Sequence, residues 1–259
     1  MYSAQVEGRY YWMIGNPTYF PVFKNLFRKN DAYENFEAQT DQAAGIFLRW
    51  VWPQSKAEIY TEVHFNDSRQ NLRDLLLDSD HSRARTIGIR KLFDLNKNKL
   101  LFEWEWTQLE QTKGRVLRDA GSWYEHLWIY HGYTNYGEVI GAGIGPGSNS
   151  NYFSLKKLNK KSKYGIAFEI IDQDNDFYYE AFDSANDYRR YWKDFNFHIN
   201  LEKKFKKFNI SSNLIYSRSL NYQWELEDNI QPYYHAGRDV NNFHFTVKIL
   251  YNLIDNTIK

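Results

Sequence analysis

A chain of 259 residues is long enough for one large β domain or two smaller ones. A content of 19% aromatic and 25% charged residues favours a single all-β unit whose strands alternate apolar and polar side chains. The formal net charge of +1 argues against nucleic-acid binding. The lack of cysteine excludes disulfides and thiolate metal sites.

The first alternating stretch begins almost at the N-terminus, over Ala4 to Trp12. The first thirty residues lack a charged start followed by an apolar signal stretch, and no apolar run approaches the roughly 18 residues that a spanning helix needs. We therefore expect the chain to start inside a strand, as one β-barrel domain over residues 1–259 that lacks an N-terminal portion.

Period-two alternation continues along the chain. Between Ala57 and Asn66, for example, Ile59 and Val63 share one face, and Glu58 and Glu62 share the other. The pattern predicts ten strands: Ala4–Trp12, Ile46–Trp52, Ala57–Asn66, Arg85–Leu92, Lys99–Thr107, Tyr152–Leu158, Lys163–Ile170, Asp194–Lys203, Ile210–Arg218 and Phe243–Leu253.

The connections between these strands alternate between two lengths. Short polar turns are expected at Pro53–Lys56, Asn96–Lys99, Asn159–Ser162 and Lys203–Lys207. Long irregular stretches cover 13–44, 66–81, 109–150, 172–190 and 219–238. A short helix with Ser68 as its cap is predicted within Ser68 to Asp80.

Short turns at one end and long loops at the other are typical of an antiparallel transmembrane β-barrel. Hydrocarbon cannot hydrogen-bond an open sheet edge, so a membrane-spanning sheet must close on itself. The polar face here is too charged for a dry core, and Trp and Tyr at strand ends suit interfacial girdles. A soluble β-sandwich with its polar residues outside is the alternative that alternation alone leaves open.

An acidic segment offers the first candidate for a metal site. Asp172, Asp174 and Asp176 stand at alternate positions, as in a calcium loop, but Phe177 occupies the position where the sharp turn requires glycine. A looser cation site or a solvated loop is the better interpretation. The seven histidines show no spacing that marks a metal site, and we predict neither metal nor cofactor.

Signals for catalysis are equally weak. The glycine run from Gly141 to Gly147 places Pro146 where a dinucleotide fingerprint needs its third glycine, and Ser148 lies outside a nucleophile elbow. Glu103 and Glu105 share the polar face and could in principle serve a glycosidase, but carboxylates facing a barrel lumen usually pair with Lys and Arg of neighbouring strands. We therefore predict that the protein is not an enzyme.

Aromatic rings gather around two of the long loops, at 123–136 and 178–192. Ring faces can stack on the C–H surfaces of sugars, while nearby Asn and Asp hydrogen-bond the hydroxyl groups. Packing within the loops or at the membrane interface is an equally good interpretation.

The stretch "WYEHLWIYHGYTNYGEVIGAGIGPGSNSNYFSLKK", followed by "GIAFEIIDQDNDFYY", resembles the Wzi-type capsule assembly family of Gram-negative outer membranes. The family hallmark is a long Tyr- and Gly-rich pattern, and the residues that match it are Gly132, Tyr133, Gly137, Ile140, Gly141, Ile144, Gly145, Pro146 and Ser148. The resemblance is strongest over residues 123–180.

This resemblance implies an outer-membrane barrel whose extracellular loops close the pore and bind capsular polysaccharide at the cell surface. Such proteins are about twice as long, so we expect this chain to be the C-terminal part of the barrel. A pore and a soluble carbohydrate-active enzyme are the competing functions.

The predicted loop 109–150 is expected to fold back tightly as a plug. Its structural motif comprises Gly132, Tyr133, Gly137, Gly141, Gly145, Pro146, Gly147 and Ser148, with a rigid corner at 145–147. The residues predicted to bind the polysaccharide are Trp123, Trp128, Tyr130, Tyr133, Asn149 and Tyr178. The expected partners are polysaccharide and the lipid bilayer.

Overall fold

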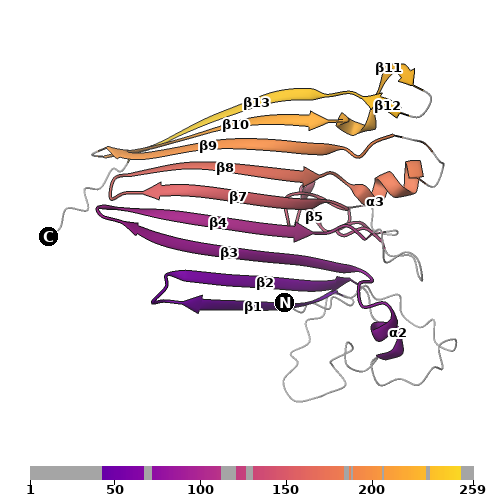
Figure 1. Cartoon of the computed structure of the whole chain (residues 1–259), viewed down its shortest axis with the longest axis horizontal. Helices are drawn as coiled ribbons and strands as arrows, with labels where there is room; N and C mark the ends of the chain where they lie inside the picture. Colours follow the sequence, from indigo (N-terminus) through magenta and orange to yellow (C-terminus); the bar gives the residue numbers. More distant parts are fainter. Residues whose placement is uncertain are drawn as a thin grey trace.

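The computed structural model describes residues 43–66, 72–111, 121–126, 131–183, 187, 189–205, 207–231 and 234–251. Nine long antiparallel strands form the main sheet, each paired with the strand that precedes it among the nine (Figure 1). They are β1 (Ala43–Trp52), β2 (Ala57–Asn66), β3 (Arg83–Leu95), β4 (Asn98–Gln108), β7 (Asn149–Leu158), β8 (Ser162–Asp172), β9 (Lys193–Phe205), β10 (Phe208–Leu220) and β13 (Val240–Tyr251).

Nine of the ten predicted strands are thereby confirmed, and the tenth, Ala4–Trp12, lies outside the described residues. Two short hairpins accompany the sheet: β5 (Thr134–Asn135) with β6 (Glu138–Val139), and β11 (Leu226–Gln231) with β12 (Tyr234–Gly237). The helical turns are α2 (Leu72–Leu77), α3 (Asn175–Tyr178), η3 (Tyr179–Asp183) and η4 (Tyr222–Trp224). No helix among these described segments is long and apolar enough to cross a membrane.

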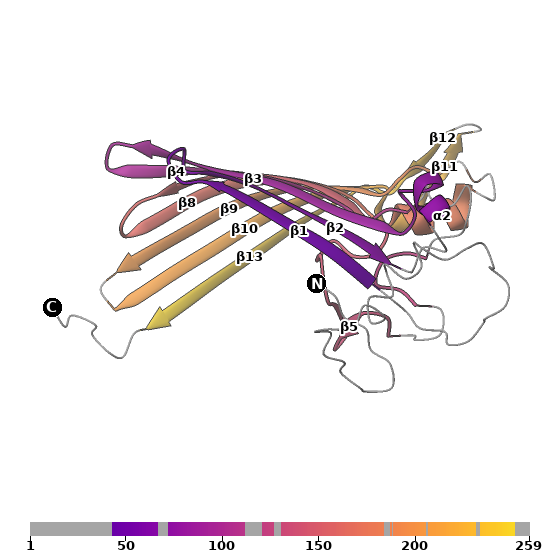
Figure 2. The same cartoon turned by 90° about the horizontal axis from the view of Figure 1, so that it is seen from below.

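Among the described residues, the sheet is twisted and open, with β1 and β13 as its two edges (Figure 2). Short turns join β1 to β2, β3 to β4, β7 to β8 and β9 to β10 at one end, as the sequence predicts, and long connections gather at the other. Asn96 adopts a positive φ of 50° in the turn between β3 and β4, a conformation that asparagine tolerates better than most residues.

The register sorts the side chains into two faces. Residues directly opposite one another on antiparallel strands point to the same side, so cross-strand rows can be followed over the whole sheet. One row is almost wholly aromatic or aliphatic: Trp50, Ile59, Ile89, Trp104, Phe153, Phe168, Phe197, Tyr216 and Phe243. The neighbouring row, on the other face, is mainly polar: Arg49, Tyr60, Gly88, Glu105, Tyr152, Glu169, Asn196, Ser217 and Asn242.

The apolar face is the exposed one. Phe153, Phe168 and Phe197 are each about 40% exposed, and Phe243 on the edge strand is 70% exposed. Within the described part of the chain, no second sheet covers these rings. Because a β-sandwich hides such a face against a partner sheet, the described residues do not support that alternative.

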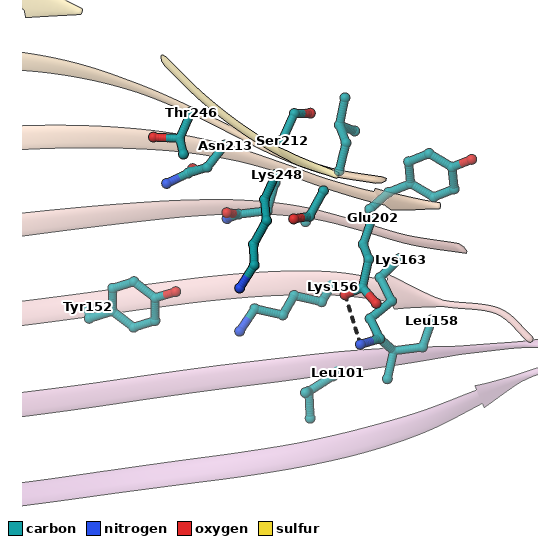
Figure 3. A pocket seen from close by; sticks show the side chains of 15 residues that line it. Leu101, Tyr152, Lys156, Leu158, Lys163, Glu202, Ser212, Asn213, Thr246 and Lys248 are labelled. Atoms are coloured by element: carbon teal, nitrogen blue, oxygen red, sulfur yellow. Dashed lines mark hydrogen bonds and ion pairs between the residues drawn. The ribbon is translucent and has the colours of Figure 1, made fainter. Parts of the chain in front are cut away.

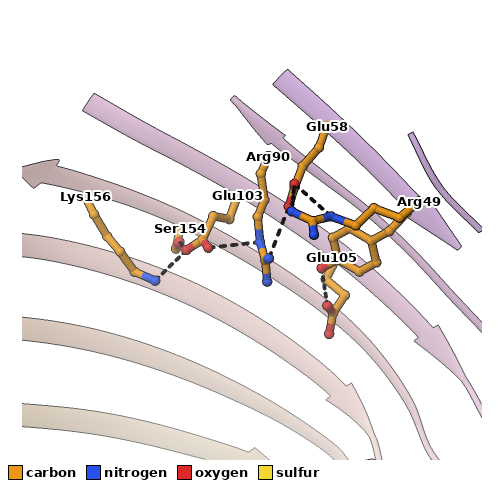
Figure 4. Close-up of polar contacts among 8 residues, drawn as sticks. Arg49, Glu58, Arg90, Glu103, Glu105, Ser154 and Lys156 are labelled. Atoms are coloured by element: carbon orange, nitrogen blue, oxygen red, sulfur yellow. Dashed lines mark hydrogen bonds and ion pairs between the residues drawn. The ribbon is translucent and has the colours of Figure 1, made fainter. Parts of the chain in front are cut away.

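The polar face carries a chain of ion pairs across five strands (Figure 4). Glu58 contacts both Arg49 and Arg90, and Glu103 contacts both Arg90 and Lys156. The Glu58–Arg90 and Arg90–Glu103 distances are 3.2 and 3.3 Å. Single exposed pairs contribute little to stability, but an alternating series also fixes which strands lie side by side. The prediction that carboxylates of this face meet Lys and Arg of neighbouring strands is confirmed.

Gly88 shows how closely this face is fitted. The Tyr60 side chain crosses β3 at Gly88 and donates its phenol hydrogen to Glu105 of β4. A Cβ atom at position 88 would occupy the place of the Tyr60 ring. Only glycine at this position therefore leaves room for the contact between β2 and β4.

We expect Gly88→Ala to displace Tyr60, break its hydrogen bond with Glu105 and lower the free energy of unfolding by about 1–2 kcal/mol. Denaturant titration in lipid or detergent measures the change. Gly165→Ala is the matched control, because its nearest neighbour there is the flexible stem of Lys156. Equal destabilisation by the two variants would contradict this account of Gly88.

Candidate functional site

The long connections form a cap at one end of the sheet, where α2, α3 and the two small hairpins lie (Figure 1). Two of these connections are joined at the point where they meet β7 and β8. The segment before β7 contains the corner Pro146–Gly147–Ser148, and the segment after β8 leads into α3. Their contacts determine how the cap is built.

A set of short hydrogen bonds locks the corner to the start of α3. The backbone amide of Asn175 donates to the Gly147 carbonyl at 2.9 Å, and the backbone amide of Asp174 donates to the Ser148 hydroxyl at 3.0 Å. The same hydroxyl donates to the Pro146 carbonyl at 2.9 Å. Ser148 is almost completely buried. The sequence-predicted corner therefore has a specific partner, which is the Asp174–Asp176 segment.

Asp176 is the most deeply buried charged residue of the lock, with 0% of its surface exposed. Its carboxylate accepts hydrogen bonds from the backbone amide of Gln111 at 2.7 Å and from the Ser122 hydroxyl at 3.0 Å. Asp174 caps α3 by accepting from the Phe177 amide at 3.1 Å. The interpretation of this acidic segment as a solvated loop is wrong for Asp176, which joins Gln111 and Ser122 of the long connection to α3.

The carboxylates of Asp174 and Asp176 accept hydrogen bonds from protein donors in this segment. Across the described residues, no group of three or more His, Asp or Glu side chains is arranged to hold a metal ion.

A second cluster surrounds Glu110. Its carboxylate accepts from the side-chain amide of Asn175 at 3.0 Å and from the side-chain amide of Asn149. The backbone amide of Glu110 donates to the side-chain oxygen of Asn149 at 3.4 Å. Asn149, predicted to bind polysaccharide, is thus half-buried and engaged within the cap.

Trp123 anchors the long connection to the sheet. It is 9% exposed and packs in a small apolar core with Ala84 and Leu109, and it meets the ring of His64 edge-on at 6.4 Å. Ala84 and His64 belong to the polar face at the ends of β2 and β3. This part of the connection therefore lies over the polar face, and its role as a plug of the lumen stays a prediction.

The neighbouring Tyr124 continues this anchor. Its phenol oxygen accepts from the Ala142 amide at 3.0 Å, and its backbone carbonyl accepts from the Tyr133 amide at 3.0 Å. Burial raises the pKa of the Tyr124 phenol, so the ring stays neutral at physiological pH. Tyr124 thereby ties the β5–β6 hairpin to the Trp123 core.

Rings of the β8–β9 connection pack together beside α3. Tyr178 is 8% exposed and donates to the Arg189 carbonyl at 2.6 Å. Its ring packs against that of Tyr191 at a tilt of 46°, with ring centroids 4.5 Å apart. Tyr179 and Tyr191 share a hydroxyl–hydroxyl hydrogen bond of 2.6 Å. That bond, with burial and the nearby Glu110 carboxylate, raises the pKa of Tyr179. Tyr191 itself is exposed.

The structure brings three of the six predicted polysaccharide-binding residues close to α3. Tyr178 belongs to α3, Asn149 reaches it through Glu110, and Trp123 follows Ser122, which binds Asp176. Tyr133 is joined to this group through Tyr124 and is 38% exposed, whereas Trp123 and Tyr178 are buried. The other two, Trp128 and Tyr130, lie outside the described residues.

The residues of the predicted loop motif are part of the same cap. Gly132, Gly137, Gly145 and Gly147 have positive φ, and Gly141 lies against the Tyr124 ring. Tyr133 precedes the β5–β6 hairpin, whose turn at Tyr136–Gly137 leaves the Tyr136 ring fully exposed. The predicted binding set does not include Tyr136, Tyr179, Tyr191 or Glu110. The run of rings could have indicated the tyrosines, but no local pattern distinguishes Glu110.

Comparisons with known proteins bear on the family and the fold. The family model described as capsule assembly protein Wzi matches residues 15–177. A solved structure of Wzi from Escherichia coli, described as an outer membrane protein involved in group 1 capsule assembly and a carbohydrate binding β-barrel, is similar with a TM-score of 0.57 and 11% identity. The match covers 83% of this chain and 43% of that one. No curated protein sequence matches the chain.

The structural match shows the fold, and the chain spans less than half the length of the Escherichia coli protein. The family model covers more than half of the 259 residues, including the Gly-rich corner and the start of α3. The chain belongs to the capsule assembly protein Wzi family.

Proposed function

We propose that this protein binds surface polysaccharide through the cap of its long connections and helps to attach capsule at the outer membrane. Family membership and the apolar face of the sheet support the location. The observation that carries the binding role is the cap itself. Buried hydrogen bonds fix α3, further hydrogen bonds hold the β5–β6 hairpin, and tyrosine rings remain exposed. A rigid support with exposed rings suits a sugar surface, because little ordering is needed on binding.

The residues of the cap divide into two roles in this proposal. Tyr133 and Tyr136 contact the polysaccharide directly with their exposed rings, and the hydroxyl of Tyr191 offers a hydrogen bond beside α3. Trp123, Asn149 and Tyr178 do not contact the polysaccharide in this proposal. They hold the cap in place, because each is buried or engaged within it. The assignment of Trp128 and Tyr130 as contacts stays a prediction.

Binding without catalysis is the second part of the proposal. Glu103 contacts Arg90, Lys156 and Ser154, and Glu105 accepts the phenol of Tyr60. Carboxylates engaged by neighbouring strands are poorly placed to act as an acid and nucleophile pair. The structure accounts for both residues through the sheet alone.

The experiment compares Tyr133→Ala/Tyr136→Ala with the unchanged protein. We expect roughly five- to tenfold weaker binding of capsular polysaccharide purified from the source bacterium, equivalent to about 1–1.4 kcal/mol, and less capsule retained on cells. Phe205→Ala is the matched control, because this ring is 57% exposed at the opposite end of the sheet. Unchanged binding in the double variant would remove the direct role of these rings.

A pore is the second candidate function, and the chain of ion pairs on the polar face favours it. The Trp123 anchor, which lies over that face, argues against free passage. Conductance across planar lipid bilayers separates the two functions: a binding protein closed by its cap gives little current, and a pore gives stable open steps.

A further inference from the structure

A hollow of about 700 Å³ lies on the polar face towards the short-turn end, away from the cap (Figure 3). Its lining comes from β4, β7, β8, β9, β10 and β13. The cross-strand row Lys156, Gly165, Asn200, Asn213 and Thr246 runs through it. Gly165 contributes no side chain to this row, which leaves space between its polar neighbours. A volume of this size suits a small ligand.

The charges in the hollow do not balance. Three lysines, Lys156, Lys163 and Lys248, line it together with one carboxylate, Glu202. Glu202 is bound by Lys163 at 2.9 Å, and Lys156 contacts Glu103. For Lys248, no carboxylate of the described residues lies within ion-pair distance. Figure 3 shows Lys156 and Lys248 reaching into the hollow from β7 and β13.

The uncharged residues of the lining indicate which chemical groups an anionic ligand has besides its charge. Asn200, Asn213 and Thr246 present amide and hydroxyl groups, and Tyr152 adds a ring that meets His198 edge-on at 6.5 Å. Amides and hydroxyls can donate to and accept from sugar hydroxyls, and an aromatic ring can cover a C–H surface of the sugar. A bare inorganic anion would use only the lysines.

We propose that this hollow binds an acidic saccharide, with Lys248 and Lys156 holding its carboxylate and the Asn200–Asn213 side holding its hydroxyl groups. The site is separate from the cap, and its ligand class follows from its own lining. A negatively charged glycan would thus meet the protein at two places along the polar face.

The test measures binding of trigalacturonate by calorimetry to the full chain in detergent, in parallel with neutral maltotriose and inorganic phosphate. We expect trigalacturonate to bind at least tenfold more tightly than maltotriose, and Lys248→Gln to weaken its binding about tenfold. Binding should also weaken as salt rises. Maltotriose binding as tightly would overturn the proposal, and so would phosphate displacing trigalacturonate at equal concentration, since the lysines alone would then explain the affinity.

Two further variants make the result specific. Lys157→Gln is the matched control, because Lys157 is the next residue of β7 and is exposed on the opposite face. It should leave trigalacturonate binding unchanged, and an equal loss from both lysine variants would contradict the site. Tyr133→Ala/Tyr136→Ala should leave the loss of trigalacturonate binding caused by Lys248→Gln unchanged, so failure of the cap as a polysaccharide site is distinguishable from failure of this hollow.

Discussion

Replacement of Asp176 by alanine is expected to release the long connection from α3 while the nine-stranded sheet persists. The buried carboxylate accepts from the Gln111 amide and the Ser122 hydroxyl, and alanine leaves both donors unpaired. Each buried donor without a partner costs about 1–3 kcal/mol, so the cap should lose several kcal/mol of local stability. Limited proteolysis of the long connection and amide hydrogen exchange measure this loss.

Asp183→Ala is the matched control, because Asp183 is an exposed carboxylate in η3 of the same connection. It should leave both measurements close to those of the unchanged protein. Circular dichroism should show the same strand content in both variants. A cap that resists protease equally in Asp176→Ala would show that the buried carboxylate is not what holds α3 in place.

Gly147→Ala is expected to open the same lock from its other side. Gly147 has a φ of +58°, and a Cβ atom there would collide with Asp174 and crowd Asp176. The left-handed conformation alone costs a residue with a side chain about 1–2 kcal/mol, and the collision adds to it. The free energy of cap opening, measured by hydrogen exchange at Gln111 and Asn175, should fall by at least that amount.

Gly143→Ala provides the comparison within the same motif. A Cβ atom at Gly143 meets nothing within 4 Å, and its φ lies outside the left-handed region. This variant should leave cap opening unchanged. If Gly143→Ala and Gly147→Ala were equally disruptive, the glycines would matter for flexibility in general rather than for the fit of one corner.

The strands were predictable because alternation is a local signal that each strand carries in its own residues. Strand ends were less predictable. The prediction gives Lys203–Lys207 as a turn, yet β9 continues to Phe205 and β10 begins at Phe208, with these two residues paired. Backbone hydrogen bonds extend a hairpin regardless of side-chain charge, so a run of lysines does not mark where pairing stops.

The candidate site was predictable only in part. The Gly-rich corner is visible in the sequence because tight turns require particular residues. Its partner is not, because the contact between Gln111 and Asp176 joins residues 65 positions apart. An isolated carboxylate normally indicates solvent exposure, and only the three-dimensional arrangement shows that Asp176 is buried with donors around it.

Site-directed spin labels on adjacent residues test the central claim most directly, namely that one face of the sheet meets lipid and the other meets water. The chain contains no cysteine, so single cysteines at Tyr152, Phe153, Asn196 and Phe197 can each carry one label in lipid vesicles. Labels at Phe153 and Phe197 should be relaxed mainly by oxygen dissolved in lipid, and labels at Tyr152 and Asn196 mainly by a water-soluble nickel chelate. Equal access of the chelate to all four positions would contradict the account.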